Sequence, residues 1–202
     1  MLISAHHLIN TPVLSMQDGG AVGRITESII DPNTLKIIAF RTEGPAIHRN
    51  FNILVASSIR EYSSLGAVID STDELVAPND VVKIAEILEL NFSLIDLTVE
   101  TKKGSKLGKI IDYTVTSDNF AIQQLIVKRP IVKGFLDPEL TIHRNEIVEI
   151  NDYKVIVKDE EKIIKKNAEK EEFVPNFVNP FREKQPGFAP ADTKTPADKD
   201  TE

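Results

Sequence analysis

Short apolar runs separated by turn residues make up most of the chain. The runs are rich in valine and isoleucine and are only a few residues long, which is typical of β-strands. Turn residues interrupt them at 17–20 and 31–33, and again at 102–105 and 117–119. Glycine, asparagine and aspartate tolerate the positive φ angles that tight hairpins require. The pattern therefore predicts a chain built mostly from short antiparallel strands.

The apolar pattern occurs twice. Val22-Gly23-Arg24-Ile25 matches Leu107-Gly108-Lys109-Ile110 at a separation of 85 residues, and Leu54 matches Ile142 at a separation of 88. An insertion of three residues between these two blocks accounts for the change in separation. A block of many short strands most simply closes into a small barrel. We therefore expect an all-β (mostly) fold with two tandem small β-barrels.

A helix is expected between the two blocks. Asn79 or Asp80 can cap it, and Val81, Ile84 and Leu88 share one face that would pack against a barrel. After residue 158 the chain becomes highly charged and then rich in proline, which predicts disorder. The expected units are a first barrel at 1–77, a connector helix at 78–90, a second barrel at 91–158, and a charged segment with a disordered tail containing Pro and Phe at 159–202.

The second block resembles the PRC-barrel family. The resemblance is carried by Val99-Glu100-Thr101, by Leu107-Gly108-Lys109-Ile110 and by the strand Ile122–Val127. Residues 13–40 form a weaker second match, so the chain resembles two tandem PRC-barrel repeats. The family includes a photosynthetic reaction-centre subunit and a ribosome-maturation factor. The resemblance therefore implies scaffolding or docking rather than catalysis.

Composition excludes several kinds of chemistry. The chain has no cysteine, so disulfides, thiolate catalysis and cysteine-bound metals are ruled out. Its histidines are His6, His7, His48 and His143, and neither these nor the glycines at 19, 20 and 23 form a recognisable metal or phosphate site. His6 and His7 are adjacent and would point to opposite faces of a strand. We expect no enzyme activity and no cofactor. Without a signal or a membrane-spanning run, the expected location is the cytoplasm, with no membrane insertion.

Charge is unevenly distributed. The chain has 24 basic and 31 acidic residues and a net charge of −7, but residues 98–158 have ten basic and eight acidic residues, a net +2. The candidate partner-binding residues of this block are Lys102, Lys103, Lys106, Lys109, Lys128, Arg129, Lys133, Phe135 and Leu136. Charged hairpin ends also serve solubility alone, and Phe135 and Leu136 are equally suited to plug the barrel end. The basic residues suit RNA or an acidic protein.

The tail contains phenylalanines that a purely solubilising segment would lack. Phe173, Phe177 and Phe181 are candidate anchors, either on the barrels of this chain or on a partner. The leading functional hypothesis is a non-catalytic adaptor that docks a partner protein through its tandem barrels. The alternative is an RNA- or ribosome-associated factor that uses the basic face of the second barrel. Neither the partner's identity nor the oligomeric state can be inferred from the sequence.

Overall fold

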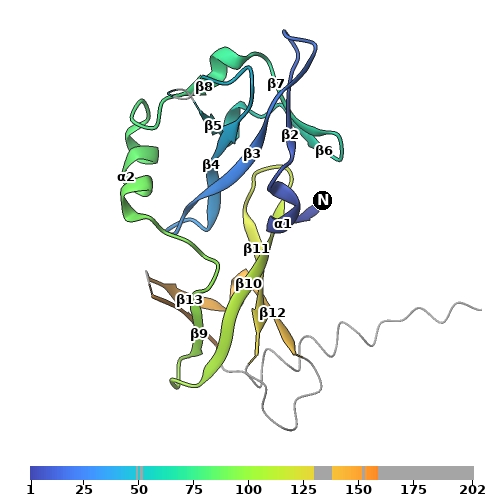
Figure 1. The fold of residues 1–202 in the computed structure, drawn as a ribbon. Helices are drawn as coiled ribbons and strands as arrows, with labels where there is room; N and C mark the ends of the chain where they lie inside the picture. Colours follow the sequence, from blue (N-terminus) through green and yellow to red (C-terminus); the bar gives the residue numbers. More distant parts are fainter. Residues whose placement is uncertain (49, 51, 130–137, 152, 159–202) are drawn as a thin grey trace, which may run out of the picture.

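The computed structural model describes residues 1–48, 50, 52–129, 138–151 and 153–158, and it is mostly β. Two seven-stranded sheets, one of them curled into a half-barrel, lie one above the other in Figure 1. The first sheet has the order β6-β7-β2-β3-β4-β5-β8. Its strands are β2 (Pro12–Ser15), β3 (Gly20–Asp31), β4 (Lys36–Glu43), β5 (Ile53–Val55), β6 (Glu61–Ser63), β7 (Gly66–Ile69) and β8 (Leu75–Val76).

The second sheet has the order β12-β11-β10-β9-β14-β13, with β1 added beside β10. Its strands are β1 (Leu2–Ser4), β9 (Thr98–Thr101), β10 (Lys106–Thr116), β11 (Ile122–Lys128), β12 (Glu139–His143), β13 (Ile147–Ile150) and β14 (Lys154–Val157). Six strands follow the same order in both sheets, because β5-β4-β3-β2-β7-β6 corresponds to β12-β11-β10-β9-β14-β13. The registers also correspond: Phe40 faces Leu54 in the first sheet, and Leu125 faces Ile142 in the second.

Two short hairpin ends join the sheets to each other. The Ile37 N–H donates to the Phe120 carbonyl at 3.0 Å, and the Ile122 N–H donates to the Leu35 carbonyl at 2.9 Å. Each of these bonds is the other's counterpart, since 35 and 37 correspond to 120 and 122 at the separation of 85. Leu35 and Phe120 both have a φ of 51°, which bulky residues rarely adopt. The two halves therefore meet through a reciprocal contact with approximate two-fold symmetry.

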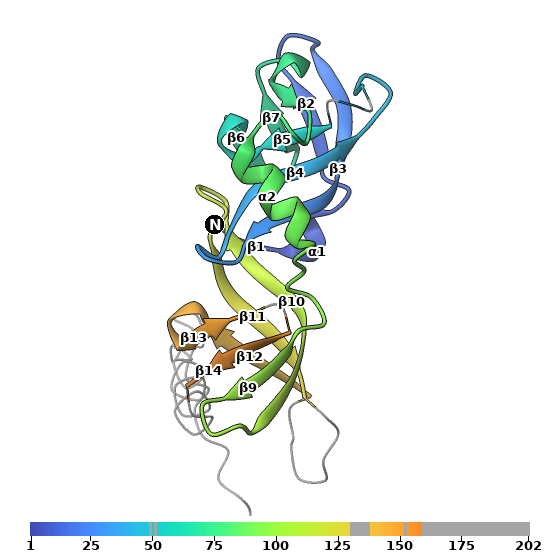
Figure 2. The same cartoon turned by 90° about the vertical axis from the view of Figure 1, so that its left-hand side faces the viewer.

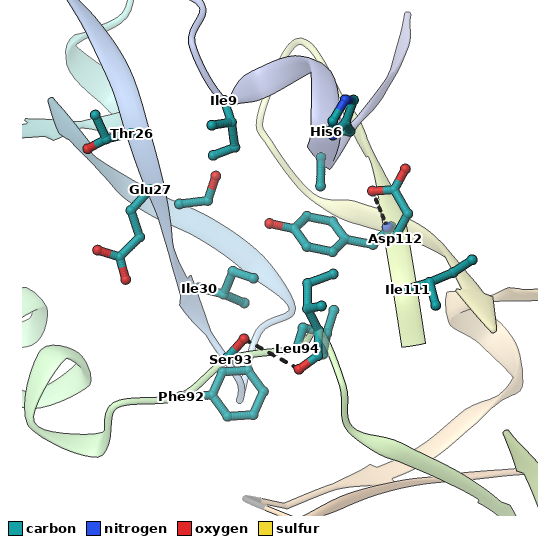
Figure 3. Close-up of a pocket in the computed structure, with 14 residues that line it drawn as sticks. His6, Ile9, Thr26, Glu27, Ile30, Phe92, Ser93, Leu94, Ile111 and Asp112 are labelled. Carbon is teal, nitrogen blue, oxygen red and sulfur yellow. Dashed lines mark hydrogen bonds between the residues drawn. The ribbon is translucent and has the colours of Figure 1, made fainter. Parts of the chain in front are cut away.

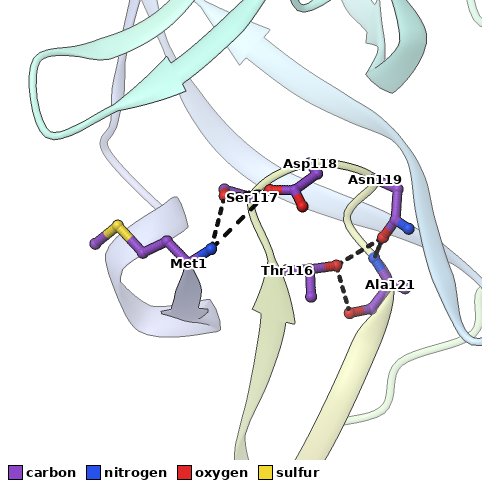
Figure 4. Close-up of polar contacts among 6 residues, drawn as sticks. All are labelled: Met1, Thr116, Ser117, Asp118, Asn119 and Ala121. Atoms are coloured by element: carbon purple, nitrogen blue, oxygen red, sulfur yellow. Dashed lines mark hydrogen bonds and ion pairs between the residues drawn. The ribbon is translucent and has the colours of Figure 1, made fainter.

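Aromatic packing fills this contact. The ring of Phe120 packs edge-to-face against Phe40 and Tyr62 of the first sheet, with centroids 5.1 and 5.8 Å apart. Figure 4 shows the polar side of the same turn, where the Thr116 hydroxyl and the Ala121 N–H both donate to Asn119 Oδ1. Met1 lies beside this turn, and the Ser117 N–H donates to its carbonyl. Phe120 is therefore a buried packing residue of the contact between the two sheets.

Helix α2 (Val82–Leu90) lies between the two halves in sequence but packs on the first sheet. Its Ile84 and Ile87 are buried against Ile29, Ala39 and Ile53, and Figure 2 shows the helix in front of β3 and β4. The helix thus packs against one sheet, as expected, while the hairpin ends form a direct contact between the two halves.

The expected cap of α2 is wrong. Val81 is the N-cap residue and makes no side-chain capping bond, while the Asp80 carboxylate accepts from the Ala77 N–H at 2.9 Å. Asp80 is engaged in the turn before the helix, so it cannot cap the first helical turn. A further difference concerns His6 and His7, which lie in the short helix α1 (Ala5–Leu8) and not in a strand. The Ser4 hydroxyl caps this helix by accepting from the His6 N–H.

Candidate docking surfaces

Lysines gather at the end of the second sheet where β9 turns into β10. Lys102 follows β9, Lys106 and Lys109 lie on β10, and Lys128 ends β11. All four side chains are exposed, and none of them forms an ion pair with another of the described residues. We call these four residues the lysine face. In Figure 2 this end of the sheet lies far from the contact between the two sheets.

The register places two of these lysines directly opposite each other. Lys109 on β10 faces Lys128 on β11, so their Cβ atoms are neighbours on one side of the sheet. Lys128 also faces Glu139 on β12, whereas the other neighbour of Lys109 is the neutral Thr98. Like charges in directly opposed positions destabilise a sheet by about 0.2–1 kcal/mol. Glu139 offsets this repulsion on the Lys128 side, but no acidic residue lies directly opposite Lys109.

The first sheet has an oppositely charged pair at the corresponding positions. There Arg24 on β3 faces Glu43 on β4, at the positions that correspond to Lys109 and Lys128. The counterparts of Lys102 and Lys106 are Met16 and Ala21, at separations of 86 and 85. The equivalent end of the first sheet is therefore electrically balanced at these positions, and the lysine face belongs to the second sheet alone.

Gly108 brings the two lysine-bearing strands together. Its φ is +149°, and a Cβ at this position would lie 2.0 Å from the Lys128 carbonyl oxygen. Gly23 has the same function in the first sheet, where a Cβ would lie 2.5 Å from the Glu43 carbonyl oxygen. Only glycine permits this approach, so Gly108 is required for the register that sets Lys109 opposite Lys128.

A second surface is a pocket of about 320 Å³ between the two sheets. It is lined by the start of the chain around α1, by β3, by β10 and by residues 92–95 before β9. Figure 3 shows Ile30 and Leu94 inside the pocket, with Glu27 of β3 on one side and Asp112 of β10 on the other. Burial raises the pKa of Tyr113, which also lines this pocket, to about 12, so its phenol stays neutral at ordinary pH.

The carboxylates of this inter-sheet pocket already have partners. Glu27 Oε2 accepts from Arg41 Nε at 2.9 Å, and its side chain remains 57% exposed. Asp112 Oδ2 accepts from the Ser4 hydroxyl, and its Oδ1 accepts from the Tyr113 N–H. A carboxylate has about four acceptor sites, so both groups keep acceptor capacity toward the pocket. Over the part of the chain that the structure describes, no three His, Asp or Glu residues are grouped so as to hold a metal ion.

Other residues singled out from the sequence lie elsewhere. Lys103 is at the tip of the β9–β10 turn, and Arg129 follows β11, where its N–H donates to the Pro138 carbonyl. The remaining candidates lie outside the described residues, namely Lys133, Phe135, Leu136, Phe173, Phe177 and Phe181. The predicted disorder of 159–202 also falls outside them. The inter-sheet pocket was not predicted from the sequence. The available signal was that Glu27 and Asp112, which both line it, occupy corresponding positions of the two blocks.

Comparison of the chain with protein-family models and with curated proteins finds no match. Within the described residues, no helix is both long enough and apolar enough to span a bilayer. The two surfaces therefore have to be interpreted from their own chemistry.

Proposed function

We propose that this protein is a non-catalytic, cytoplasmic adaptor that docks an acidic segment of a partner protein on its lysine face. One observation carries the proposal: the second sheet sets Lys109 opposite Lys128 where the first sheet sets Arg24 opposite Glu43. A face that serves solubility alone gains nothing from a like-charged pair over a balanced one. An anionic partner offsets the repulsion by lying between the two ammonium groups.

We also propose that the two halves are tandem barrel-like units related to the PRC-barrel family, with α2 as their connector. The shared order of six strands and the shared registers support this relation. A rigid barrel that presents charged hairpin ends is suited to docking, because the strands hold the side chains in place before the partner arrives.

The alternative is RNA bound to the same lysines. Single-stranded RNA is held partly by bases that stack on exposed aromatic rings. Tyr113 and Phe120, the aromatic residues of the β10–β11 hairpin, are buried, and Tyr153, which is 84% exposed, is the only exposed large aromatic side chain among the described residues. The scarcity of stacking partners favours an acidic protein segment over RNA.

The test replaces lysines of the second sheet by the residues found at the corresponding positions of the first sheet. Lys128→Glu restores an Arg24–Glu43-like pair at Lys109, and Lys106→Ala supplies the counterpart Ala21. The full chain and its variants are titrated with a fluorescent glutamate-rich peptide and with an unstructured RNA oligonucleotide, each at low and moderate salt. Lys36→Glu is the matched control, because it makes the same charge change on the first sheet.

The adaptor proposal expects the glutamate-rich peptide to bind the unmodified chain more weakly as salt rises. Lys128→Glu should lower that affinity about tenfold or more, since it replaces an attraction by a repulsion, while Lys36→Glu leaves it nearly unchanged. The unmodified chain should also capture a partner protein from nuclease-treated lysate, and the Lys128→Glu variant should not capture it. Binding of RNA but not of the peptide would reject the adaptor in favour of the alternative, and equal loss with Lys36→Glu would reject both.

A further inference from the structure

The inter-sheet pocket has the opposite character to the lysine face. Three of its exposed lining residues are apolar, Ile9, Ile95 and Ile111, which are 37%, 37% and 39% exposed. The other exposed lining residues are His6, Glu27 and Ser93. Ile30 and Leu94 also line the pocket and are buried, at 4% and 1% exposed. Exposed apolar side chains gathered around one pocket are the kind of surface that marks interaction sites.

The pocket also has a negative charge. Of its fourteen lining residues, Glu27 and Asp112 are acidic, and none is lysine or arginine. The two carboxylates flank the apolar floor from opposite sides in Figure 3. The only other ionisable groups that line it are the exposed His6 and the buried Tyr113, and Arg41 reaches its edge through Glu27. Arg41 offsets the charge of Glu27, so the remaining negative charge of the lining is that of Asp112. An apolar floor beside this charge is complementary to an apolar side chain next to a cation.

The repeat shows that the site lies on the approximate two-fold axis. Ile9 corresponds to Ile95 at a separation of 86, and Glu27 corresponds to Asp112 at a separation of 85. Each half thus contributes an isoleucine and a carboxylate at corresponding positions, and the second half adds Ile111, whose counterpart is Thr26. Residues of both halves line the pocket, so it forms only when the two sheets are in contact.

From these features we infer that the inter-sheet pocket binds a segment of a second partner protein in which a large aliphatic side chain is next to lysine or arginine. The volume of about 320 Å³ is at the lower end for ligand pockets and fits a side chain or two. The adaptor then has two sites of opposite charge, one for an acidic segment and one for a basic, apolar segment. The pocket does not depend on the lysine face, so either site can fail without the other.

The test uses three short synthetic peptides of equal length. One alternates leucine with lysine, one alternates leucine with glutamate, and one alternates serine with lysine. Each is titrated into the isotopically labelled full chain, and backbone amide shifts are followed by NMR. The leucine–lysine peptide is expected to shift the amides of residues 26–30, 92–95 and 111–113, with weak or no shifts from the other two.

Two variants locate the site. Ile111→Thr installs the residue found at the counterpart position, Thr26, and should weaken binding of the leucine–lysine peptide about fivefold, because an exposed apolar contact is lost. Glu27→Gln should weaken it about two- to fivefold by removing one charge. Glu149→Gln, at an exposed position on β13 outside the pocket, and Lys128→Glu on the lysine face should both leave it unchanged.

Several outcomes would overturn the inference. Equal binding of all three peptides, or binding that survives Ile111→Thr, means that the pocket does not recognise this chemistry. A concentration-dependent dimer in sedimentation, with shifts of the same amides and no peptide present, means that a second copy of the chain occupies the pocket. If the leucine–lysine peptide does not bind but the glutamate-rich peptide still does, the pocket inference fails and the adaptor proposal stands. If only the leucine–lysine peptide binds, the adaptor proposal fails and the pocket inference stands.

Discussion

The two sheets share a strand order but differ in what their matching surfaces present to solvent. Buried positions keep their apolar character, as with Ile25 and Ile110, both 0% exposed. Exposed positions have diverged: Glu43 corresponds to Lys128 and Thr26 to Ile111. Packing constrains the inward positions of both sheets alike, whereas an outward side chain changes with little cost to the fold. These two differences lie at the lysine face and at the inter-sheet pocket, the two surfaces for which we propose binding.

The largest expected effect comes from the contact between the sheets. Phe120→Ala should lower the free energy of unfolding by about 3–5 kcal/mol, because it removes a buried ring that packs on Phe40 and Tyr62. Phe120→Leu makes this turn resemble its counterpart at Leu35 and should cost less than about 1.5 kcal/mol. Urea denaturation of both variants measures the difference. A loss for Phe120→Ala no larger than about 1.5 kcal/mol would show that the ring does not fill the contact.

The strand glycines come next. Gly108→Ala should cost about 3 kcal/mol, because φ is +149° and the new Cβ meets the Lys128 carbonyl. Gly23→Ala should cost less, since its φ is not in the positive range and its Cβ would lie 2.5 Å from the Glu43 carbonyl oxygen, against 2.0 Å from the Lys128 carbonyl oxygen at Gly108. The comparison uses the same denaturation assay, and a larger loss for Gly23→Ala would contradict it.

Asp31 distinguishes the first sheet by a buried ion pair. Its carboxylate is 2% exposed and accepts from Lys83 at 2.8 Å. Burial raises its pKa, but hydrogen bonds, from Lys83 above all, outweigh burial and hold the pKa below the usual range of an aspartate. The ionised carboxylate thus stabilises the fold above the ordinary aspartate pKa, and the stabilisation is lost as pH falls through the lowered pKa.

Asp31→Asn should therefore cost about 1–2 kcal/mol at neutral pH. The difference from the unmodified chain should shrink as the pH falls below the ordinary aspartate pKa of about 3.9 and through the lowered pKa of Asp31. Denaturant unfolding over a pH series measures this. The counterpart of Asp31 is Thr116, so Thr116→Val serves as the control, and its cost should not change over the same pH range. A difference for Asp31→Asn that stays constant down to low pH would contradict the assignment.

The smallest effect concerns the lysine face. Lys128→Glu should change the free energy of unfolding by less than about 0.5 kcal/mol, because it removes the repulsion from Lys109 but adds a repulsion from Glu139 on β12. Both contributions should weaken at high salt. A clear destabilisation would mean that Lys128 contributes to the fold, and the argument that its charge is kept for binding would lose its basis.

Sequence patterns predicted the β-rich fold and the turns, because alternating apolar residues and turn residues act locally. They did not predict the reciprocal contact, since Leu35 and Phe120 resemble ordinary strand residues until the two hairpin ends are seen together. They misplaced His6 and His7 in a strand, because a helix as short as α1 depends on a single Ser4 cap. The lysines of the second block were identified, but the opposition of Lys109 and Lys128 depends on a bulged register that composition does not encode.

The pairing of Leu2–Ser4 with Thr114–Thr116 also has a consequence for how the chain acquires its structure. During synthesis the strands of the first sheet can pair before β10 exists, whereas β1 has to wait for more than a hundred further residues. Closing so long a loop is slow, since its entropy is lost before its contacts form. We expect β1 to dock last and to exchange its amide hydrogens first. The opening of the inter-sheet pocket, which lies next to this strand, would then be the last surface to become functional.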